Sequence, residues 1–184
     1  MNVSIRQEAP ADRPSVDDLV ADAFGPGRFA KSAYRLREGV DDIPALSFIA
    51  EMDGSIVGTV RYWPVDIGGT AAIMLGPIAV LTGMQGQGIA LQLMQSSLAA
   101  AKTLGHRIVV LVGDEPYYAR VGFSRIVPVG SVTMPGPVDL NRMLGLALVD
   151  GALDGLNGEL RKPHMHHPHE ALGAGLASFP APTQ

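Results

Sequence analysis

Three glycines, Gly83, Gly86 and Gly88, lie within six residues of one another, between an apolar run and a stretch with helical spacing. Glycine allows the backbone to come close to a bulky group and to adopt positive φ angles. A helix that begins directly on such a turn leaves N–H groups without partners at the positive end of its dipole. The spacing therefore predicts an anion site, most simply a site for phosphate.

Two elements must hold this turn in place. The residues from Ile73 to Leu81 are apolar enough for a strand that is buried on both faces. After Gly88, apolar residues recur at spacings of three and four, which indicates a helix that packs on a core: Leu91, Met94, Leu98 and Ala101. We expect a strand, a phosphate-binding turn and a helix in direct succession.

Two common phosphate-binding motifs fit this turn poorly. A Walker-type loop ends in Gly-Lys-Ser/Thr, whereas Gly88 is followed by Ile89 and Ala90, so no lysine reaches a γ-phosphate. A dinucleotide-binding turn requires a small residue where this chain has Leu91, and an acidic residue about 20 positions further on, whereas Asp114 comes late. A nucleotide-binding domain, such as a kinase-like protein, is therefore the weaker alternative.

The third possibility is a family resemblance. Gln85-Gly86-Gln87-Gly88-Ile89-Ala90 resembles the Gln/Arg-x-x-Gly-x-Gly/Ala signature of the GCN5-related N-acetyltransferase (GNAT) superfamily. The run from Tyr117 to Phe123, YYARVGF, resembles the second hallmark of that family, Tyr-x-x-x-Gly-Phe. The residues Leu75–Val80 and Gly113–Tyr118 resemble the YhbS-like bacterial branch. The resemblance covers Val3 to Pro128, and more faintly the segment to about Arg161.

The resemblance implies an α/β (α+β) fold: a mixed, mostly antiparallel central sheet with a splayed parallel strand pair and flanking helices. We expect one acetyltransferase domain over residues 1–161, with its core at 3–128 and C-terminal strands to about 150. Residues 162–184 would form a flexible tail that contains the histidines from His164 to His169. We expect no metal site in this tail, because prolines interrupt it and no second ligand cluster accompanies it.

The resemblance also implies acetyl-CoA as the acetyl donor. In the family, the amides of the loop hold the pyrophosphate of the coenzyme, and the preceding strand runs beside its pantetheine arm. Carried over to this chain, the cofactor-binding residues are Ile78, Ala79, Val80, Gln85, Gly86, Gln87, Gly88, Ile89, Ala90 and Leu91. Gly76-Pro77 within this strand is a plausible position for a bulge.

Tyr118 stands at the position of the family's general acid and is our candidate for protonating the departing thiolate, with Tyr117 as the fallback. A phenol with a pKa near 10 is a weaker acid than a thiol near 8.5, so this transfer is uphill by about 2 kcal/mol when both are unperturbed. The general base cannot be assigned from the sequence. Its acidic or titratable candidates are Glu51, Asp114, Glu115 and His106, and we also expect Asp114 to cap the short helix that follows.

The function implied is the transfer of an acetyl group from acetyl-CoA to a primary amine of a small molecule or protein. A non-catalytic acyl-CoA sensor with the same fold is the main alternative. The net charge of −4 gives no reason to expect nucleic acid or an anionic membrane as a partner. No signal segment or long apolar stretch stands out, and the chain has no cysteine, so we expect a cytoplasmic protein, which could be a homodimer.

The remaining elements follow from local signals. We expect a strand at Val3–Arg6, a helix from Pro10 to Phe24, and a second helix from Arg28 to Glu38. The basic residues of the second helix, Arg28, Lys31, Arg35 and Arg37, either form a solvated face, which is the commoner arrangement, or meet an acidic part of the acceptor.

Asp53-Gly54 predicts a hairpin between strands at Leu46–Met52 and Ser55–Trp63. Further along the chain we expect the following elements: a strand at Arg107–Val112, a short helix at Pro116–Val121, and two last strands at Val127–Thr133 and Met143–Val149.

Overall fold

The computed structural model describes residues 3–26 and 32–163. Its strands are β1 (Ser4–Gln7), β2 (Phe48–Met52), β3 (Ser55–Ile67), β4 (Thr70–Val80), β5 (Ile108–Val112), β6 (Ser124–Arg125), β7 (Val132–Thr133), β8 (Met143–Ala147) and β9 (Gly158–Arg161). The helices are α1 (Arg13–Phe24), α2 (Ser32–Arg35), α3 (Ile89–Thr103) and α4 (Glu115–Tyr118). Short 3-10 turns are η1 (Pro10–Asp12), η3 (Pro44–Leu46), η4 (Ala119–Val121) and η5 (Leu140–Arg142).

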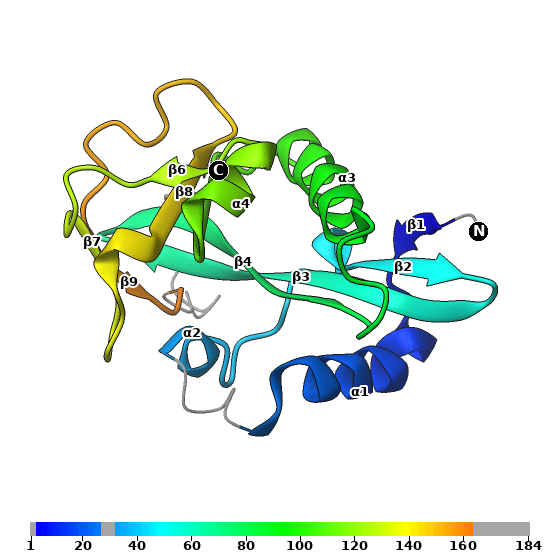
Figure 1. Cartoon of the computed structure of the whole chain (residues 1–184). Helices are drawn as coiled ribbons and strands as arrows, with labels where there is room; N and C mark the ends of the chain where they lie inside the picture. Colours follow the sequence, from blue (N-terminus) through cyan, green and yellow to red (C-terminus); the bar gives the residue numbers. More distant parts are fainter. Residues whose placement is uncertain (1–2, 27–31, 164–184) are drawn as a thin grey trace, which may run out of the picture.

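The central sheet has the strand order β1-β2-β3-β4-β5-β8-β6, with β9 beside the far end of β3 and β7 beside β9. Neighbours along the main path are antiparallel except β4 and β5, which are parallel. In Figure 1, α3 covers one face of the sheet, and α1 and α2 lie on the other face. The expected fold is confirmed: a mostly antiparallel mixed sheet with one parallel pair and flanking helices.

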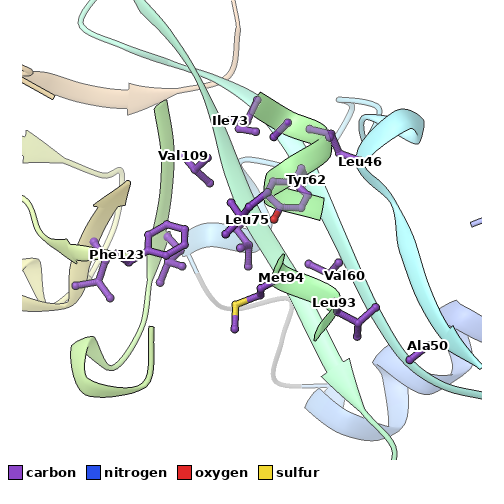
Figure 2. Close-up of a cluster of buried hydrophobic side chains, with 14 of the residues drawn as sticks. Leu46, Ala50, Val60, Tyr62, Ile73, Leu75, Leu93, Met94, Val109 and Phe123 are labelled. Atoms are coloured by element: carbon purple, nitrogen blue, oxygen red, sulfur yellow. The ribbon is translucent and has the colours of Figure 1, made fainter. Parts of the chain in front are cut away.

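The alternation of side chains along β4 separates two hydrophobic clusters. Ile73 and Leu75 belong to the cluster under α3, whereas Ala72 and Met74 belong to the cluster on the opposite face. Because successive strand residues point to opposite faces, a strand that is apolar throughout needs a partner on both sides. Figure 2 shows the first cluster, in which Leu93 and Met94 of α3 meet side chains of β3 and β4.

Local sequence signals place the hairpin and the bulge of the first half of the chain correctly. The hairpin turn at Asp53 and Gly54 is present, with φ angles of 50° and 77° that match the left-handed turn this residue pair favours. The predicted bulge is also present: Val60 pairs with Ile78 and Tyr62 with Leu75, so one residue of β3 faces the Gly76-Pro77 dipeptide.

Three expectations from the sequence need correction. The helix expected at 28–38 spans only Ser32–Arg35 within the described residues, and the chain then turns. Residues 28–31 lie outside the described residues, as does the histidine run 164–169. The strand expected at Val127–Thr133 is reduced to the two residues of β7, and the predicted last strand ends at Ala147 rather than at Val149. The short strand β9 was missed, because it gains its partners from β3 and β7, far away in the sequence.

Candidate active site

The turn before α3 presents a row of unpaired amides. Gly88 is the N-cap of α3 with a φ angle of 79°, and Gly86 has a φ angle of 78°. Within the described part of the chain, no backbone N–H group from Gln85 to Leu91 donates a hydrogen bond. A side chain built at Gly86 or Gly88 would meet no atom within 4 Å, so open space lies in front of both residues. The amides and the helix dipole together form a site for an anion.

A cavity of about 390 Å³, here called the first cavity, lies against this turn. Its walls come from β4, the turn, the first residues of α3, and the segment α4–η4. The lining residues are Ile78, Val80, Met84, Gln85, Gly86, Gly88, Ile89, Ala90, Leu91, Tyr117, Tyr118 and Arg120. Most of the residues predicted from the sequence to bind a cofactor therefore surround one space.

Two of the predicted binding residues do not line the first cavity. Ala79 is buried, because it lies between Ile78 and Val80 on a strand whose side chains alternate between faces. Gln87 is exposed, and its amide nitrogen lies 3.8 Å from the sulfur of Met84. The side chains of these two predicted residues therefore do not line the first cavity.

The two parallel strands are paired over a short length only. Their register joins Ile73 to Val109 and Met74 to Val110, and β4 then continues to Val80 without β5. The Gly76-Pro77 bulge directly follows the paired part of β4. Because β4 and β5 diverge there, the backbone of Ile78–Val80 is left beside the first cavity rather than covered by a neighbouring strand.

Tyr118 is held by its packing and not by a hydrogen bond of its hydroxyl group. Its ring is half-buried and makes edge contacts with Phe123 at 6.0 Å and with Tyr117 at 5.1 Å between ring centroids. No described residue hydrogen-bonds the hydroxyl group, which leaves it available to a ligand. Burial, reinforced by Tyr117 and Asp114 and opposed by Arg142, raises the pKa of Tyr118 above its usual value.

Gly113 determines where the ring of Tyr118 can lie. A Cβ atom at residue 113 would stand 2.3 Å from Cε2 and 2.8 Å from Cδ2 of Tyr118, and 2.9 Å from a methyl group of Leu111. The glycine is thus required for the ring to lie against the end of β5.

The Gly113→Ala variant should therefore move the tyrosine ring without touching the cofactor turn. For the acetyl transfer that the motif resemblance implies, we expect kcat to fall about 10-fold or more, because a displacement of 1 Å at a catalytic group costs up to ~100-fold. The Kd for acetyl-CoA, measured by calorimetry, should change little. An unchanged kcat would show that the position of this ring does not matter.

Arg120 is a cation that the sequence reasoning missed. It is exposed, lies 6.0 Å from the ring of Tyr117, and lines the first cavity together with the turn. The turn itself carries no cation, as expected, but the segment after α4 brings one to the same space. The signal was present in the sequence, because Arg120 stands inside the YYARVGF run.

The four candidates for the general base are distant from this space or engaged elsewhere. Glu51 is bound by Arg6, Glu115 accepts hydrogen bonds from Arg125, and Asp114 pairs with Arg142 at 3.2 Å. Asp114 is the N-cap residue of α4, but contrary to expectation its side chain makes no capping hydrogen bond.

The fourth candidate, His106, follows the C-terminal end of α3, and burial lowers its pKa. None of the four candidates lines the first cavity or the two cavities described next. The base therefore stays unassigned.

A second cavity, of about 170 Å³, adjoins the first through Ile78 and Tyr118, which line both. Its other walls come from α1, α2, the bulge and the end of β5: Val20, Phe24, Ala33, Tyr34, Arg37, Leu75, Gly76, Pro77, Leu111 and Val112. A third cavity, of about 440 Å³, continues from it past Arg37 and Pro77. Tyr118 thus stands where the space beside the turn meets the space beneath α1 and α2.

The described residues contain no group of three or more side chains that could hold a metal ion. Among the helices of residues 3–26 and 32–163, none has the length and apolar character needed to cross a membrane.

Comparison with known proteins supports the relationship that the motifs suggested. The model of the Acetyltransferase (GNAT) family matches residues 13–123. Over 123 residues the chain is 37% identical to the uncharacterized N-acetyltransferase YhbS of Escherichia coli K12, a match that covers 65% of this chain and 72% of that protein.

Two solved structures are similar over most of their length. The crystal structure of Escherichia coli YhbS in complex with CoA has a TM-score of 0.74 and 30% identity, and the match covers 88% of this chain and 89% of that one. A GNAT family acetyltransferase from Brucella melitensis in complex with acetyl-CoA has a TM-score of 0.65 and 28% identity, with coverage of 89% and 97%.

Proposed function

This chain belongs to the GNAT acetyltransferase family, and on that premise we propose that it transfers the acetyl group of acetyl-CoA to a primary amine. The observation that carries the proposal is the row of unpaired amides from Gln85 to Leu91, which faces a cavity that Tyr118 also lines. Relatives with similar structures hold CoA or acetyl-CoA. The same donor is proposed for this chain.

The diphosphate of the coenzyme is proposed to bind at the turn. The N–H groups of Gly86, Gly88 and their neighbours donate to the phosphate oxygens, and the positive end of α3 contributes roughly half a unit charge. Arg120, which also lines the first cavity, supplies a full positive charge. The open space in front of both glycines is what lets a diphosphate approach the backbone.

The acetyl group is proposed to lie beside Ile78–Val80. An N–H group of this exposed strand edge would polarise the thioester carbonyl and stabilise the oxyanion that forms when the amine attacks. The attack forms the C–N bond; the oxyanion then collapses and the C–S bond breaks, while the amine nitrogen gives up its extra proton to solvent water, from which Tyr118 is reprotonated after each turnover. Tyr118 is placed to hydrogen-bond the sulfur and to give the departing thiolate its proton, because its hydroxyl group has no partner among the described residues.

An acyl-CoA sensor that shares this fold is the competing proposal. The two differ in turnover, so the deciding test is the release of free thiol from acetyl-CoA in the presence of polyamines, amino acids, aminoglycosides and lysine peptides. An acetyltransferase releases thiol with at least one amine class and leaves an acetylated amine. A sensor binds acetyl-CoA and releases no thiol above the rate of hydrolysis.

The contribution of the turn can be measured with two matched variants at the ends of α3. Gly88 and Gly105 have φ angles of 79° and 83°, and a Cβ atom at either would meet nothing within 4 Å. Gly88→Val and Gly105→Val should therefore strain the backbone similarly. Only Gly88→Val should raise the Kd for acetyl-CoA, by about 10- to 100-fold, which corresponds to one lost hydrogen bond to a charged group.

Calorimetric titration with acetyl-CoA measures both variants, and thermal unfolding confirms that their stabilities match. Equal affinities in the two variants would count against the turn as the diphosphate site. The homodimer, the cytoplasmic location and the domain limits at residues 161 and 162 stay predictions.

A further inference from the structure

Arg37 is a half-buried cation that forms no ion pair with any acidic side chain of the described residues. It lies in the turn after α2, two residues beyond the end of the helix, and its guanidinium group lies 4.9 Å from the centre of the Trp63 ring. Its Nε atom is buried and has no hydrogen-bond partner. Among residues 3–26 and 32–163, no carboxylate forms a salt bridge with Arg37. The sequence favoured a solvated arginine here, and the structure shows otherwise.

Arg13 and Arg61 line the third cavity together with Arg37, and both form ion pairs. Arg61 binds Glu8 and Asp17, and Arg13 binds Asp42 at 2.6 Å. The carboxylates closest to the third cavity are therefore already engaged, apart from the exposed side chains of Glu38 and Asp41. Unlike Arg13 and Arg61, Arg37 has no carboxylate paired with it among the described residues.

Arg37 still carries its charge under ordinary conditions. Burial, slightly opposed by Tyr34, lowers the pKa of Arg37 to about 10, which leaves the guanidinium protonated at neutral pH. Contact with an indole ring compensates for only a small part of the lost hydration. A buried charge without a partner is unfavourable, and groups of this kind cluster at sites where a ligand completes the pairing.

The backbone around Arg37 leaves room for its guanidinium at the bulge of β4. A Cβ atom at residue 76 would lie 2.9 Å from Nη2 of Arg37, so Gly76 is the residue that admits it. Arg37 and Tyr118 both line the second cavity. An acceptor in this cavity would have its amine near Tyr118 and another part of its structure near Arg37.

We propose that Arg37 binds an anionic group, a carboxylate or a phosphate, of the amine that accepts the acetyl group. This inference rests on the proposed acetyltransferase function. The planar fork of N–H groups of a guanidinium matches both anions, because it can donate two parallel hydrogen bonds. The second cavity measures about 170 Å³, which fits a small amine such as an amino acid or an aminoalkyl phosphate.

The test uses pairs of acceptors that differ only in the anion. The common amino acids are compared with their C-terminal amides, and 2-aminoethyl phosphate with ethanolamine. For the preferred acceptor we expect kcat/KM to exceed that of its uncharged partner by about 10- to 100-fold, the range for hydrogen bonds to a charged group. The amino acid and the phosphate arms separate the two possible anions.

Arg37→Met should remove this preference, chiefly through KM, and leave the uncharged amine and the Kd for acetyl-CoA nearly unchanged. Arg37→Lys should restore part of it, because lysine keeps the charge but loses the fork. Arg35→Met is the matched control: Arg35 lies on α2, is exposed, and lines none of the three cavities. Thermal unfolding monitors whether each variant is folded.

The inference is overturned if wild-type protein acetylates the uncharged partners as well as the anionic ones, or if Arg37→Met keeps the preference. Calorimetric titration of CoA-saturated protein with the same amines and with their N-acetylated products requires no turnover. If an anionic amine or its N-acetylated product binds the wild-type protein but not Arg37→Met, the inference is supported even where no thiol is released. Absence of any preferential binding by the anionic members overturns it, whatever the outcome for acetyl transfer.

Discussion

Tyr118→Phe is expected to lower kcat for acetyl transfer by roughly 100- to 10,000-fold, the usual contribution of a positioned general acid. The change removes one hydroxyl group and leaves the ring that packs on Phe123 and Tyr117. The Kd for acetyl-CoA should stay nearly the same, because the proposed diphosphate site is made by the turn before α3 and not by the Tyr118 hydroxyl group. Stopped-flow measurement of thiol release separates the chemical step from binding.

The raised pKa of Tyr118 sharpens this expectation. Burial makes the phenol an even weaker acid than the unperturbed comparison with a thiol implies, so proton transfer to the sulfur must accompany the departure of the thiolate. A raised pKa also keeps the phenol protonated to higher pH. Any loss of activity caused by ionisation of Tyr118 should therefore appear only above pH ~10.

Tyr117→Phe is the matched control, since Tyr117 lines the same cavity one residue earlier but is more exposed. It should retain most of the activity. If Tyr118→Phe keeps its kcat while Tyr117→Phe loses it, the acid is Tyr117. If neither variant loses activity, neither tyrosine supplies the proton.

The second large effect is on stability. Arg61→Met should lower the free energy of unfolding by about 3–5 kcal/mol, because the buried Glu8 carboxylate loses both of its hydrogen bonds and keeps only Arg13, at 4.0 Å. Arg61 donates to both carboxylate oxygens of Glu8 at 2.6 and 2.8 Å and to Asp17 at 2.7 Å. The side chains of Arg61 and Glu8 are only 7% and 3% exposed. This network ties β1 and α1 to β3, on the side of the sheet where the third cavity lies.

An exposed ion pair of equal length provides the control. Arg161 lies 2.6 Å from Glu159, but these side chains are 64% and 39% exposed. Arg161→Met should therefore change stability by at most about 1 kcal/mol. Urea denaturation at pH 7 measures both variants. Similar losses of stability in the two variants would show that burial does not strengthen the Glu8–Arg61 interaction. Recovery of stability in the double variant Glu8→Leu/Arg61→Met would show that the loss in Arg61→Met comes from the Glu8 carboxylate that has lost its hydrogen bonds.

The parts of the fold that were predictable from the sequence depend on neighbours in the chain. Asp53-Gly54 makes its own turn, and the glycines before α3 leave amides unpaired whatever the rest of the molecule does. The continuous apolar run in β4 predicted a strand covered on both faces, and the two clusters on either side of it confirm this.

The parts that could not be predicted depend on residues that are distant in sequence. Arg37 becomes a half-buried cation only because Trp63 and the Gly76 bulge lie beside it. The strand β9 exists because Ile67 and Val132 offer free edges to it. The role of Gly113 depends on the ring of Tyr118, which packs against it.

The most direct test of the central claim, that the amides at Gly86 and Gly88 hold the diphosphate, is a crystal structure of the complex with acetyl-CoA. We expect phosphate oxygens within hydrogen-bond distance of the N–H groups of residues 85–91, and the thioester beside Ile78–Val80 with its sulfur in reach of the Tyr118 hydroxyl group. A diphosphate bound anywhere else, with these amides still facing solvent, would contradict the account.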